Sequence, residues 1–273
     1  MSILRITSTS DENLNVYTNL TNHELRNKLD PERGVVIVES ETAIRVALER
    51  GVQPLSFLLD ERKLQAMSDV LEQLPPQIPI YVLPPEEVEQ LCGYNVTRGA
   101  LCAMRRPPMP SLRELVAGKQ RVVVLEGLTD TSNVGAAFRN AAALGADAVI
   151  VAPSCADPLA RRAVRVSMGN VFCVPWMRAE KPWPGELFSV LHDEGYCCVA
   201  LALEEGAVSL GDKSLAQVDA PLALFFGSEG QGLSRKVIRS CDRTVIIPMS
   251  AGVDSLNVAA TTGIVLWELR RRG

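Results

Sequence analysis

The chain has 273 residues, of which 47% are hydrophobic and 22% are charged, and its formal net charge is −4. These values are typical of a soluble globular protein with one large domain or two smaller ones, and they exclude a protein covered in positive charge, although not a local basic patch. Because no stretch approaches the ~20 apolar residues of a membrane-spanning helix and the amino terminus lacks the order of a secretory signal, we expect a cytoplasmic protein without membrane contact.

The first hundred residues mix short strands with helices. Apolar runs predict strands at 34–40, 55–60 and 78–83, and the segments 41–51 and 85–93 have helical patterns. No catalytic group of residues stands out in this part of the chain. We therefore predict a small α/β domain over residues 1–104 that binds or positions a substrate.

A proline-bearing stretch at 105–120 follows, and it is typical of a linker that contains a short helix. From residue 121 to 273, strands and helices alternate regularly. Strands are predicted at 122–127, 148–153, 171–176 and 197–203, separated by helices; the segments 222–241 and 244–269 each predict a strand, a loop and a helix. Continuous apolar strands separated by helices predict a parallel sheet covered on both faces. Ligands of such sheets lie beyond the carboxyl ends of the strands.

The loop "FFGSEGQGLS" invites a nucleotide-binding interpretation, which its spacing excludes. Gly227, Gly230 and Gly232 form GxxGxG rather than the GxGxxG of dinucleotide sites, and no GxxxxGK[ST] occurs. Glycines here would instead let the main chain approach a flat ligand closely. Glu229 would repel a phosphate but suits a cationic or amino-bearing ligand. A tight turn with a solvated glutamate is the alternative interpretation.

The last helix, within 254–269, is apolar almost all round, which predicts that it is buried in the domain or at an interface. Its start is polar, and Asp254 or Ser255 could simply cap it. Arg139 lies in an alanine-rich helix, which predicts a buried guanidinium group and hence a site. An arginine that extends to the surface is the alternative.

Three arginine clusters, at 105–106, 161–165 and 270–272, are compatible with a phosphate-rich partner, although solvated faces explain each cluster by itself. The seven cysteines form no CxxC pair and there are only two histidines, so we predict reduced, buried thiols and no metal site.

Polar residues thus follow three predicted strands, each at a helix start. Three motifs, "NVGAAFRNAAALGA" (133–146), "LALFFGSEGQGLS" (222–234) and "VIIPMSAGVDSLNVAATTGIVLWE" (245–268), occur in the order and spacing of a known family. As a set they resemble the SpoU family of RNA ribose 2′-O-methyltransferases, within the SPOUT superfamily. The resemblance covers about 121–273, and the amino-terminal part is similar, more loosely, to the small RNA-binding domain that often precedes this catalytic domain.

The resemblance implies a parallel sheet with a deep carboxyl-terminal trefoil knot, which general topology rules treat as nearly forbidden. It also implies a homodimer with the site at the subunit interface, and S-adenosylmethionine (AdoMet) as the cofactor. Binding of AdoMet would fall to main-chain and apolar contacts from Gly227, Ile247, Leu256, Pro248, Met249 and Leu201. Catalysis would fall to Arg139, Asn133, Glu229, Ser255 and Asn257.

The chemistry implied by the resemblance requires an aligned ribose oxygen and the management of one proton. Arg139 is a poor base, because the pKa of a guanidinium exceeds ~12. We therefore expect Arg139 to orient the hydroxyl group, clamp a phosphate and stabilise developing negative charge. Asn133 and Glu229 would position Arg139 or the ribose, and Ser255 and Asn257 would bind the substrate or fix the loop.

The sequence departs from the family pattern at two places. Thr131 and Ser132 stand where many relatives have proline and glycine, and Leu203, Glu204 and Glu205 stand where threonines are frequent. These departures bear on AdoMet affinity rather than on the type of reaction.

The sequence leaves two other functional classes open. The chain could be a dimeric SPOUT-like protein that binds RNA without methylating it, or a nucleotide-dependent α/β enzyme such as an oxidoreductase, although the latter lacks its phosphate loop. For the methyltransferase, ribosomal RNA is favoured over transfer RNA because a separate substrate-binding half precedes the catalytic one.

Overall fold

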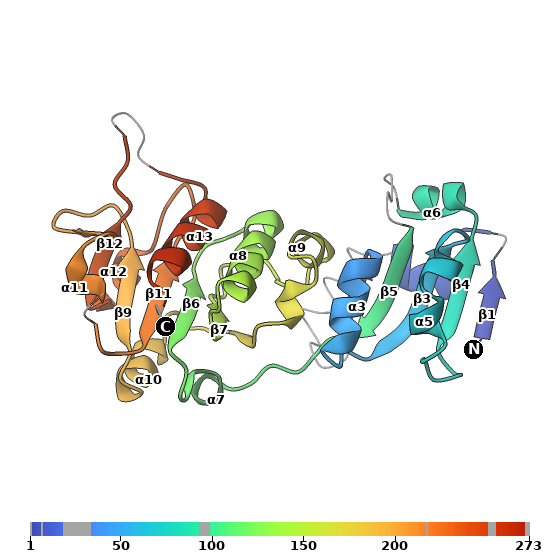
Figure 1. Cartoon of the computed structure of the whole chain (residues 1–273), viewed down its shortest axis with the longest axis horizontal. Helices are drawn as coiled ribbons and strands as arrows, with labels where there is room; N and C mark the ends of the chain where they lie inside the picture. The colour runs from blue at the N-terminus through green and yellow to red at the C-terminus, as the bar shows by residue number, and fades with distance from the viewer. Residues whose placement is uncertain are drawn as a thin grey trace. The chain divides into compact units, whose positions relative to one another are not determined.

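A computed structural model of the chain describes residues 2–6, 8–18, 34–92, 99–216, 218–250 and 255–270. The chain forms two compact units (Figure 1). The first unit comprises Met1–Pro108 and Leu159–Phe172, and the second comprises Met109–Pro158 and Cys173–Gly273. The segment 159–172 thus packs with the amino-terminal unit. The division into a substrate domain (1–104), a linker (105–120) and a catalytic domain (121–273) stays a prediction.

Among its described residues, the first unit contains a five-stranded sheet of order β1-β4-β3-β5-β2. The strands are β1 (Ser2–Arg5), β2 (Val35–Glu39), β3 (Pro54–Asp60), β4 (Pro79–Leu83) and β5 (Ala100–Arg105). β4 runs parallel to β1 and β3, whereas β5 runs antiparallel to β2 and β3. The three predicted strands are confirmed; β1 and β5 were not predicted from the sequence.

Helices cover this sheet. They are α1 (Asn15–Thr18) after the 3-10 turn η1 (Glu12–Leu14), α3 (Glu41–Glu49), α4 (Lys63–Ala66), α5 (Ser68–Leu71), α6 (Pro85–Cys92) and α9 (Arg161–Val166). The two predicted helices are confirmed as α3 and α6. Ser40 caps α3 by accepting a hydrogen bond from the Ala43 N–H, and Gly51 follows it with a φ of +78°, a conformation that glycine adopts without strain.

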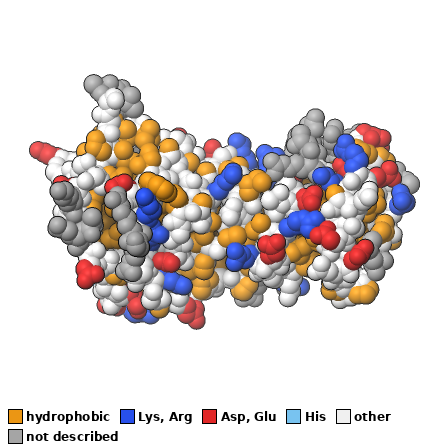
Figure 2. All heavy atoms as spheres, in the orientation of Figure 1, with side chains coloured by type: hydrophobic (Ala, Val, Ile, Leu, Met, Phe, Trp, Pro, Cys, Tyr) orange, Lys and Arg blue, Asp and Glu red, His pale blue; other side chains and the backbone are white. Residues whose placement is uncertain are grey.

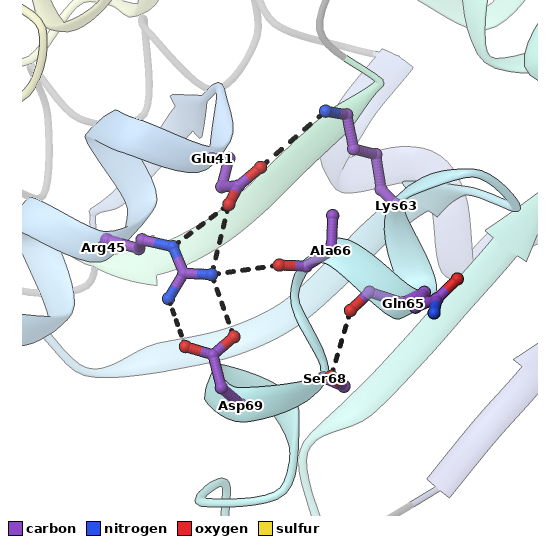
Figure 3. Close-up of polar contacts among 7 residues, drawn as sticks. All are labelled: Glu41, Arg45, Lys63, Gln65, Ala66, Ser68 and Asp69. Atoms are coloured by element: carbon purple, nitrogen blue, oxygen red, sulfur yellow. Dashed lines mark hydrogen bonds and ion pairs between the residues drawn. The ribbon is translucent and has the colours of Figure 1, made fainter.

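A polar network ties α3 to α4 and α5 (Figure 3). Arg45 donates to both carboxylate oxygens of Asp69 at 2.6 and 2.9 Å, to Glu41 at 3.2 Å and to the Ala66 carbonyl at 3.1 Å. Lys63 lies 3.8 Å from Glu41. The hydrogen bond from Arg45 holds the pKa of the Asp69 carboxyl below its ordinary value. The charged groups of this network therefore pair with one another within the first unit.

The arginine cluster at 161–165 has a structural role in the same unit. Arg161 Nε donates to Glu39 Oε2 at 3.2 Å, and Arg165 Nη1 lies 3.7 Å from Glu39 Oε1. Glu39 is buried at the end of β2, and a buried carboxylate needs a charged partner. Two of the arginines that indicated a phosphate-rich partner are therefore engaged within the protein.

The second unit contains a seven-stranded sheet, counted over its described residues, of order β10-β12-β9-β11-β6-β7-β8. The strands are β6 (Arg121–Leu125), β7 (Ala148–Val151), β8 (Trp176–Arg178), β9 (Cys197–Leu201), β10 (Val208–Ser209), β11 (Leu222–Phe226) and β12 (Arg243–Ile246). Every neighbouring pair is parallel. The predicted parallel sheet is therefore confirmed.

One predicted strand of this unit is wrong. The segment 171–176 contains the end of a 3-10 turn, η3 (Asn170–Phe172), and the strand begins only at Trp176. Pro175 explains the error, because proline has no N–H to donate to a strand neighbour. Its carbonyl instead accepts a hydrogen bond from the Val149 N–H at the sheet edge.

The helices of this unit are α7 (Leu112–Val116), α8 (Thr131–Ala143), α10 (Leu187–Asp193), α11 (Lys213–Ala216), α12 (Arg235–Ser240) and α13 (Val258–Glu268). α7 is the short helix predicted within 105–120. Its Leu115 and Val116 belong to a core formed with residues of β6, β9, β11 and α10.

Helices α8 and α13 lie side by side (Figure 1). Asn140 of α8 donates through Nδ2 to the Ala259 carbonyl and to Thr262 Oγ1, at 2.5 and 3.0 Å. The sequence predicted burial of this helix in the domain or at an interface, and in the single chain part of α13 is exposed. Ile264 is 41% exposed and Trp267 is 55% exposed, and hydrophobic side chains are visible on the surface of this unit (Figure 2). One side of α13 is therefore free for a partner.

Among the helices that the structure describes, none has both the length and the apolar character required to cross a lipid bilayer. The trefoil knot stays a prediction. The chain between β12 and α13 includes residues 251–254, which lie outside the described part, as do residues 93–98 of the loosely similar segment before the linker.

Candidate functional site

A cavity of about 650 Å³ lies at the carboxyl ends of β9, β11 and β12. Its volume is within the ~300–1,000 Å³ of small-molecule sites, and its place is the one expected for ligands of parallel sheets. All six residues predicted to bind AdoMet line this cavity: Leu201, Gly227, Ile247, Pro248, Met249 and Leu256. The structure thus brings three distant segments to one pocket.

The glycine loop forms one wall of the cavity. The Gly232 N–H donates to the Ser228 carbonyl at 2.9 Å, so the loop folds back on itself. A Cβ atom at Gly227 would lie 2.2 Å from the Gly232 carbonyl carbon and 2.3 Å from the Leu233 nitrogen. Only glycine fits there, because those neighbours are backbone atoms. The close main-chain approach predicted for these glycines is present.

Two amide side chains and one carboxylate meet beside this cavity, from the first turn of α8, the glycine loop and the start of α13. Asn133 Nδ2 donates to Glu229 Oε1 at 3.0 Å, and Asn257 Nδ2 donates to Asn133 Oδ1 at 3.1 Å. Asn257 Nδ2 also donates to Glu229 Oε1. Glu229 itself lines the cavity. The predicted convergence of these three residues is therefore present, and we call it the Asn–Glu–Asn triangle.

Asn257 also begins the last helix. Its Oδ1 accepts a hydrogen bond from the Ala259 N–H at 2.8 Å, which makes Asn257 the N-cap of α13. Of the two alternative caps, Ser255 does not cap the helix, and Asp254 lies outside the described residues. Ser255 precedes the helix and lines the cavity instead. One side chain thus starts the helix and ties it to Glu229.

Arg139 is not part of the Asn–Glu–Asn triangle in the single chain, and its role at a subunit interface stays a prediction. It is exposed, it does not line the cavity, and its side chain has no hydrogen bond or ion pair within the described part of the chain. The reason is the helical period: α8 buries Val134, Ala137, Phe138 and Ala141, and Arg139 falls on the opposite face. The expected burial of its guanidinium group is wrong for the single chain.

The sequence did not reveal how the glycine loop is anchored. Glu126, which is 6% exposed, accepts hydrogen bonds from the Ser234 N–H at 2.7 Å, Ser234 Oγ at 2.9 Å and Trp183 Nε1 at 2.6 Å. Ser234 in turn caps α12. A carboxylate at the end of the apolar run "VVVLE" was the one signal that could have pointed to Glu126, because buried carboxylates are rare without partners.

Two further charged residues line the cavity. Arg235 Nη1 donates to Glu204 Oε1 and Oε2 at 2.7 and 2.8 Å. Glu204 lies in the loop after β9, at a position where the sequence departs from the family pattern. Arg235 is the first residue of α12, and nothing in the sequence connected it to that loop.

A group of potential metal ligands, His192, Cys198 and Asp242, lies elsewhere in the unit, with ligand atoms within 4.8 Å of one another. Burial raises the pKa of the Cys198 thiol to about 12. Because metals bind the thiolate rather than the thiol, this thiol is a poor ligand at neutral pH. The six cysteines whose side chains are described are free, and no ligand set surrounds the cavity within the described residues.

Comparison with known proteins covers both units. The chain matches the model described as the SpoU rRNA Methylase family over residues 120–267. It is 38% identical over 263 residues to an uncharacterized tRNA/rRNA methyltransferase of Mycobacterium bovis, which covers 96% of this chain and 90% of that protein.

Solved structures share the same fold. An AdoMet-bound rRNA methyltransferase from Sinorhizobium meliloti superimposes with a TM-score of 0.80 at 22% identity, covering 98% of this chain and 97% of that one. An RNA 2′-O ribose methyltransferase superimposes with a TM-score of 0.78 at 26% identity, covering 97% and 98%. The similarity therefore includes the amino-terminal unit as well as the unit that contains the cavity.

Proposed function

Because the chain belongs to the SpoU methylase family, we propose that it transfers the methyl group of AdoMet to a ribose 2′-hydroxyl group of RNA. The observation that carries the proposal is the Asn–Glu–Asn triangle, in which three segments distant in sequence meet beside one cavity. A similar solved protein is named an RNA 2′-O ribose methyltransferase, and another of the same fold was solved with AdoMet.

The residues around the cavity fit AdoMet chemically. Leu201, Ile247 and Leu256 offer apolar surface to an adenine ring, and the bare backbone at Gly227 permits close approach. Glu229 offers a carboxylate to a cationic ligand, which suits a sulfonium and would not suit a phosphate. When bound, AdoMet supplies an already activated methyl group.

The chain's own residues would hold and orient the acceptor. The triangle fixes Glu229 through two amide donors, so the carboxylate has one defined position. Ser255 lies at the cavity as a free hydroxyl donor or acceptor for the RNA or the loop. Arg139 would orient the ribose hydroxyl group and stabilise the negative charge that develops on its oxygen.

We further propose that a second copy of the chain completes the site. Arg139 is exposed in the single chain, and the exposed apolar side chains of α13, Ile264 and Trp267, line a second groove with Ile247 and Pro248. Since Ile247 and Pro248 also line the main cavity, a partner on this groove would lie next to the site. The expected trefoil knot belongs to the same proposal.

Substitution of Ile264 by aspartate should convert the dimer to a monomer and abolish methyl transfer, because a buried unpaired charge in an apolar contact is costly. Sedimentation velocity measures the mass. A monomeric wild-type protein with full activity would contradict the dimer.

For the substrate, we favour ribosomal over transfer RNA, because the family model is described as an rRNA methylase and the amino-terminal unit forms a separate module. Within this proposal, residues 1–104 bind the RNA, 105–120 link the parts and 121–273 carry out the transfer, in the cytoplasm. Mapping 2′-O-methylated nucleotides in total RNA, with and without the gene, identifies the target.

The direct test uses AdoMet with an isotope-labelled methyl group and RNA from cells that lack the gene. We expect label in 2′-O-methylnucleosides after digestion, and Arg139→Ala should abolish it while S-adenosylhomocysteine still binds. Arg239→Ala, which removes an exposed arginine of α12, is the control. Label on a base, or full activity of Arg139→Ala, would contradict the assigned chemistry. An RNA-binding protein without catalysis would instead show no saturable heat with AdoMet.

A further inference from the structure

The rim of the main cavity holds an ion pair that the proposed reaction does not use. Arg235 Nη1 donates to both oxygens of Glu204, and both residues line the cavity. The side chain of Arg235 is 75% exposed, and that of Glu204 is 28% exposed. The pair thus lies at the opening rather than in the floor of the cavity.

The other charge at the cavity is already engaged. Glu229 accepts hydrogen bonds from the amides of Asn133 and Asn257. Among the described residues that line the cavity, Arg235 is the one cationic side chain. A carboxylate on a bound ligand would therefore find its charge-matched donor at Arg235.

AdoMet has such a group. Its amino-acid end carries an α-ammonium and an α-carboxylate on one carbon, while its nucleoside end is neutral and flat. An adjacent carboxylate and guanidinium are complementary to that zwitterion, with Glu204 facing the ammonium and Arg235 facing the carboxylate. The walls at Leu201, Ile247 and Leu256 offer no comparable group.

We propose that Glu204 and Arg235 form the subsite that binds the amino-acid end of AdoMet. The inference rests on the proposed function, since it presumes that AdoMet occupies the cavity. It assigns a role to the loop after β9, where Glu204 replaces the threonines frequent in the family.

The donor count agrees with this role. The hydrogen bonds to Glu204 use only Nη1 of Arg235. The remaining guanidinium nitrogens have donors for a ligand carboxylate while Glu204 holds the side chain in place. A pre-positioned arginine loses less side-chain entropy on binding than a mobile one.

The test compares two ligands that differ only at the end in question. S-adenosylhomocysteine carries the amino-acid end, and 5′-methylthioadenosine lacks it. Arg235→Ala should lower the affinity for S-adenosylhomocysteine by about tenfold, as expected for loss of a partly exposed charge-assisted hydrogen bond. The affinity for 5′-methylthioadenosine should stay within about twofold of the wild-type value. Calorimetry on the full chain measures both affinities.

Matched variants separate the subsite from general effects. Glu204→Gln should lower the affinity for S-adenosylhomocysteine and not that for 5′-methylthioadenosine. Arg235→Lys should keep part of the S-adenosylhomocysteine affinity that Arg235→Ala loses. Arg239→Ala removes an exposed arginine one turn along α12 that does not line the cavity, and it should change neither affinity.

Two results would overturn the inference while the proposed function stands. One is an unchanged affinity of Arg235→Ala for S-adenosylhomocysteine. The other is an equal loss of affinity for both ligands, which would place Arg235 at the nucleoside end. Absence of saturable S-adenosylhomocysteine binding by the wild-type protein would instead overturn the proposed function, and the inference with it.

Discussion

The sheets of the two units differ in strand direction. In the first unit β5 runs antiparallel between β3 and β2, so its carboxyl end lies at the edge opposite to theirs. In the second unit every described neighbouring pair is parallel, so β6, β9, β11 and β12 end at one edge. The loops that follow these four strands supply Glu126, Glu204, Glu229 and the cavity residues from Ile247 onward.

The charged groups of the units differ in the same way. In the first unit Arg45 bonds to Asp69 and Glu41, and Arg161 bonds to Glu39. In the second unit Glu229 accepts from two amides beside an open cavity. These charged groups of the first unit therefore pair with one another, whereas Glu229 is held beside an open cavity.

The largest effect is expected where the cavity wall is backbone. Gly227→Ala places a Cβ atom 2.2 Å from the Gly232 carbonyl carbon, which the loop can relieve only by moving. We expect S-adenosylhomocysteine binding to be lost and stability to fall by about 1–3 kcal/mol, the usual cost of overpacking. Calorimetry and thermal denaturation measure the two changes.

Gly230→Ala is the control in the same loop. A Cβ atom there meets nothing within 4 Å, and its φ is not positive. Because Gly230 itself lines the cavity, this variant is a control for stability, which should stay at the wild-type value. Normal binding by Gly227→Ala would show that the glycine loop is not part of the ligand site.

The next effect concerns the triangle. Glu229→Ala removes the carboxylate that accepts hydrogen bonds from both Asn133 and Asn257, so we expect kcat to fall by about 10²-fold, as misplaced reacting groups commonly cause. Glu205→Ala, an exposed glutamate that does not line the cavity, should leave kcat unchanged. Single-turnover methyl transfer is the measurement. Equal rates for the two variants would remove the triangle from the mechanism.

A smaller effect is expected at the anchor of the glycine loop. Glu126→Gln keeps the size of the side chain but places an amide against the donors of Ser234 and Trp183. We expect a loss of about 2 kcal/mol of stability, the scale for an unpaired buried group, with weaker S-adenosylhomocysteine binding. Exposed Glu180→Gln is the control. Unchanged stability and affinity would show that Glu126 does not hold the loop.

Much of the second unit could be predicted from the sequence because its signals are local. Apolar runs predicted six strands, of which only 171–176 was wrong, where Pro175 removes a donor. Asn133, Glu229 and Asn257 were predicted to meet because each follows a parallel strand. In the first unit, by contrast, β5 was not predicted, although its residues from Ala100 to Met104 form a buried apolar run.

Two features of the site depend on which face of a helix is covered, and a sequence does not state that face. Arg139 has alanine neighbours, yet α8 turns it to solvent. The helix α13 is apolar, yet Ile264 and Trp267 are exposed in the single chain. The Glu204–Arg235 pair joins two elements 31 residues apart, and no local pattern marks such a contact.

The smallest effect is expected in the first unit, where a substitution should lower stability without changing the rate of methyl transfer. Arg45→Ala removes the partner of Asp69 and Glu41 (Figure 3). For this partly exposed arginine we expect a loss of about 1 kcal/mol or less, with unchanged kcat. All three tryptophans belong to the second unit, so tryptophan fluorescence would not follow unfolding of the first unit. Hydrogen exchange of peptides from α3 measures the stability of the first unit instead.

The pKa of Asp69 determines how the stability lost in Arg45→Ala should change with pH. Arg45 holds the pKa of Asp69 below its ordinary value of 3.8. A carboxyl group with a lowered folded-state pKa contributes stability above its unfolded pKa and loses it as the pH falls through the folded value. The difference between wild type and Arg45→Ala should therefore be full at pH 7 and shrink below about pH 4. Arg113→Ala, at an exposed ion pair with Asp193 in the second unit, is the control and should leave hydrogen exchange in α3 unchanged. If the stability difference between wild type and Arg45→Ala instead grew on acidification, Asp69 would not be the group that Arg45 stabilises.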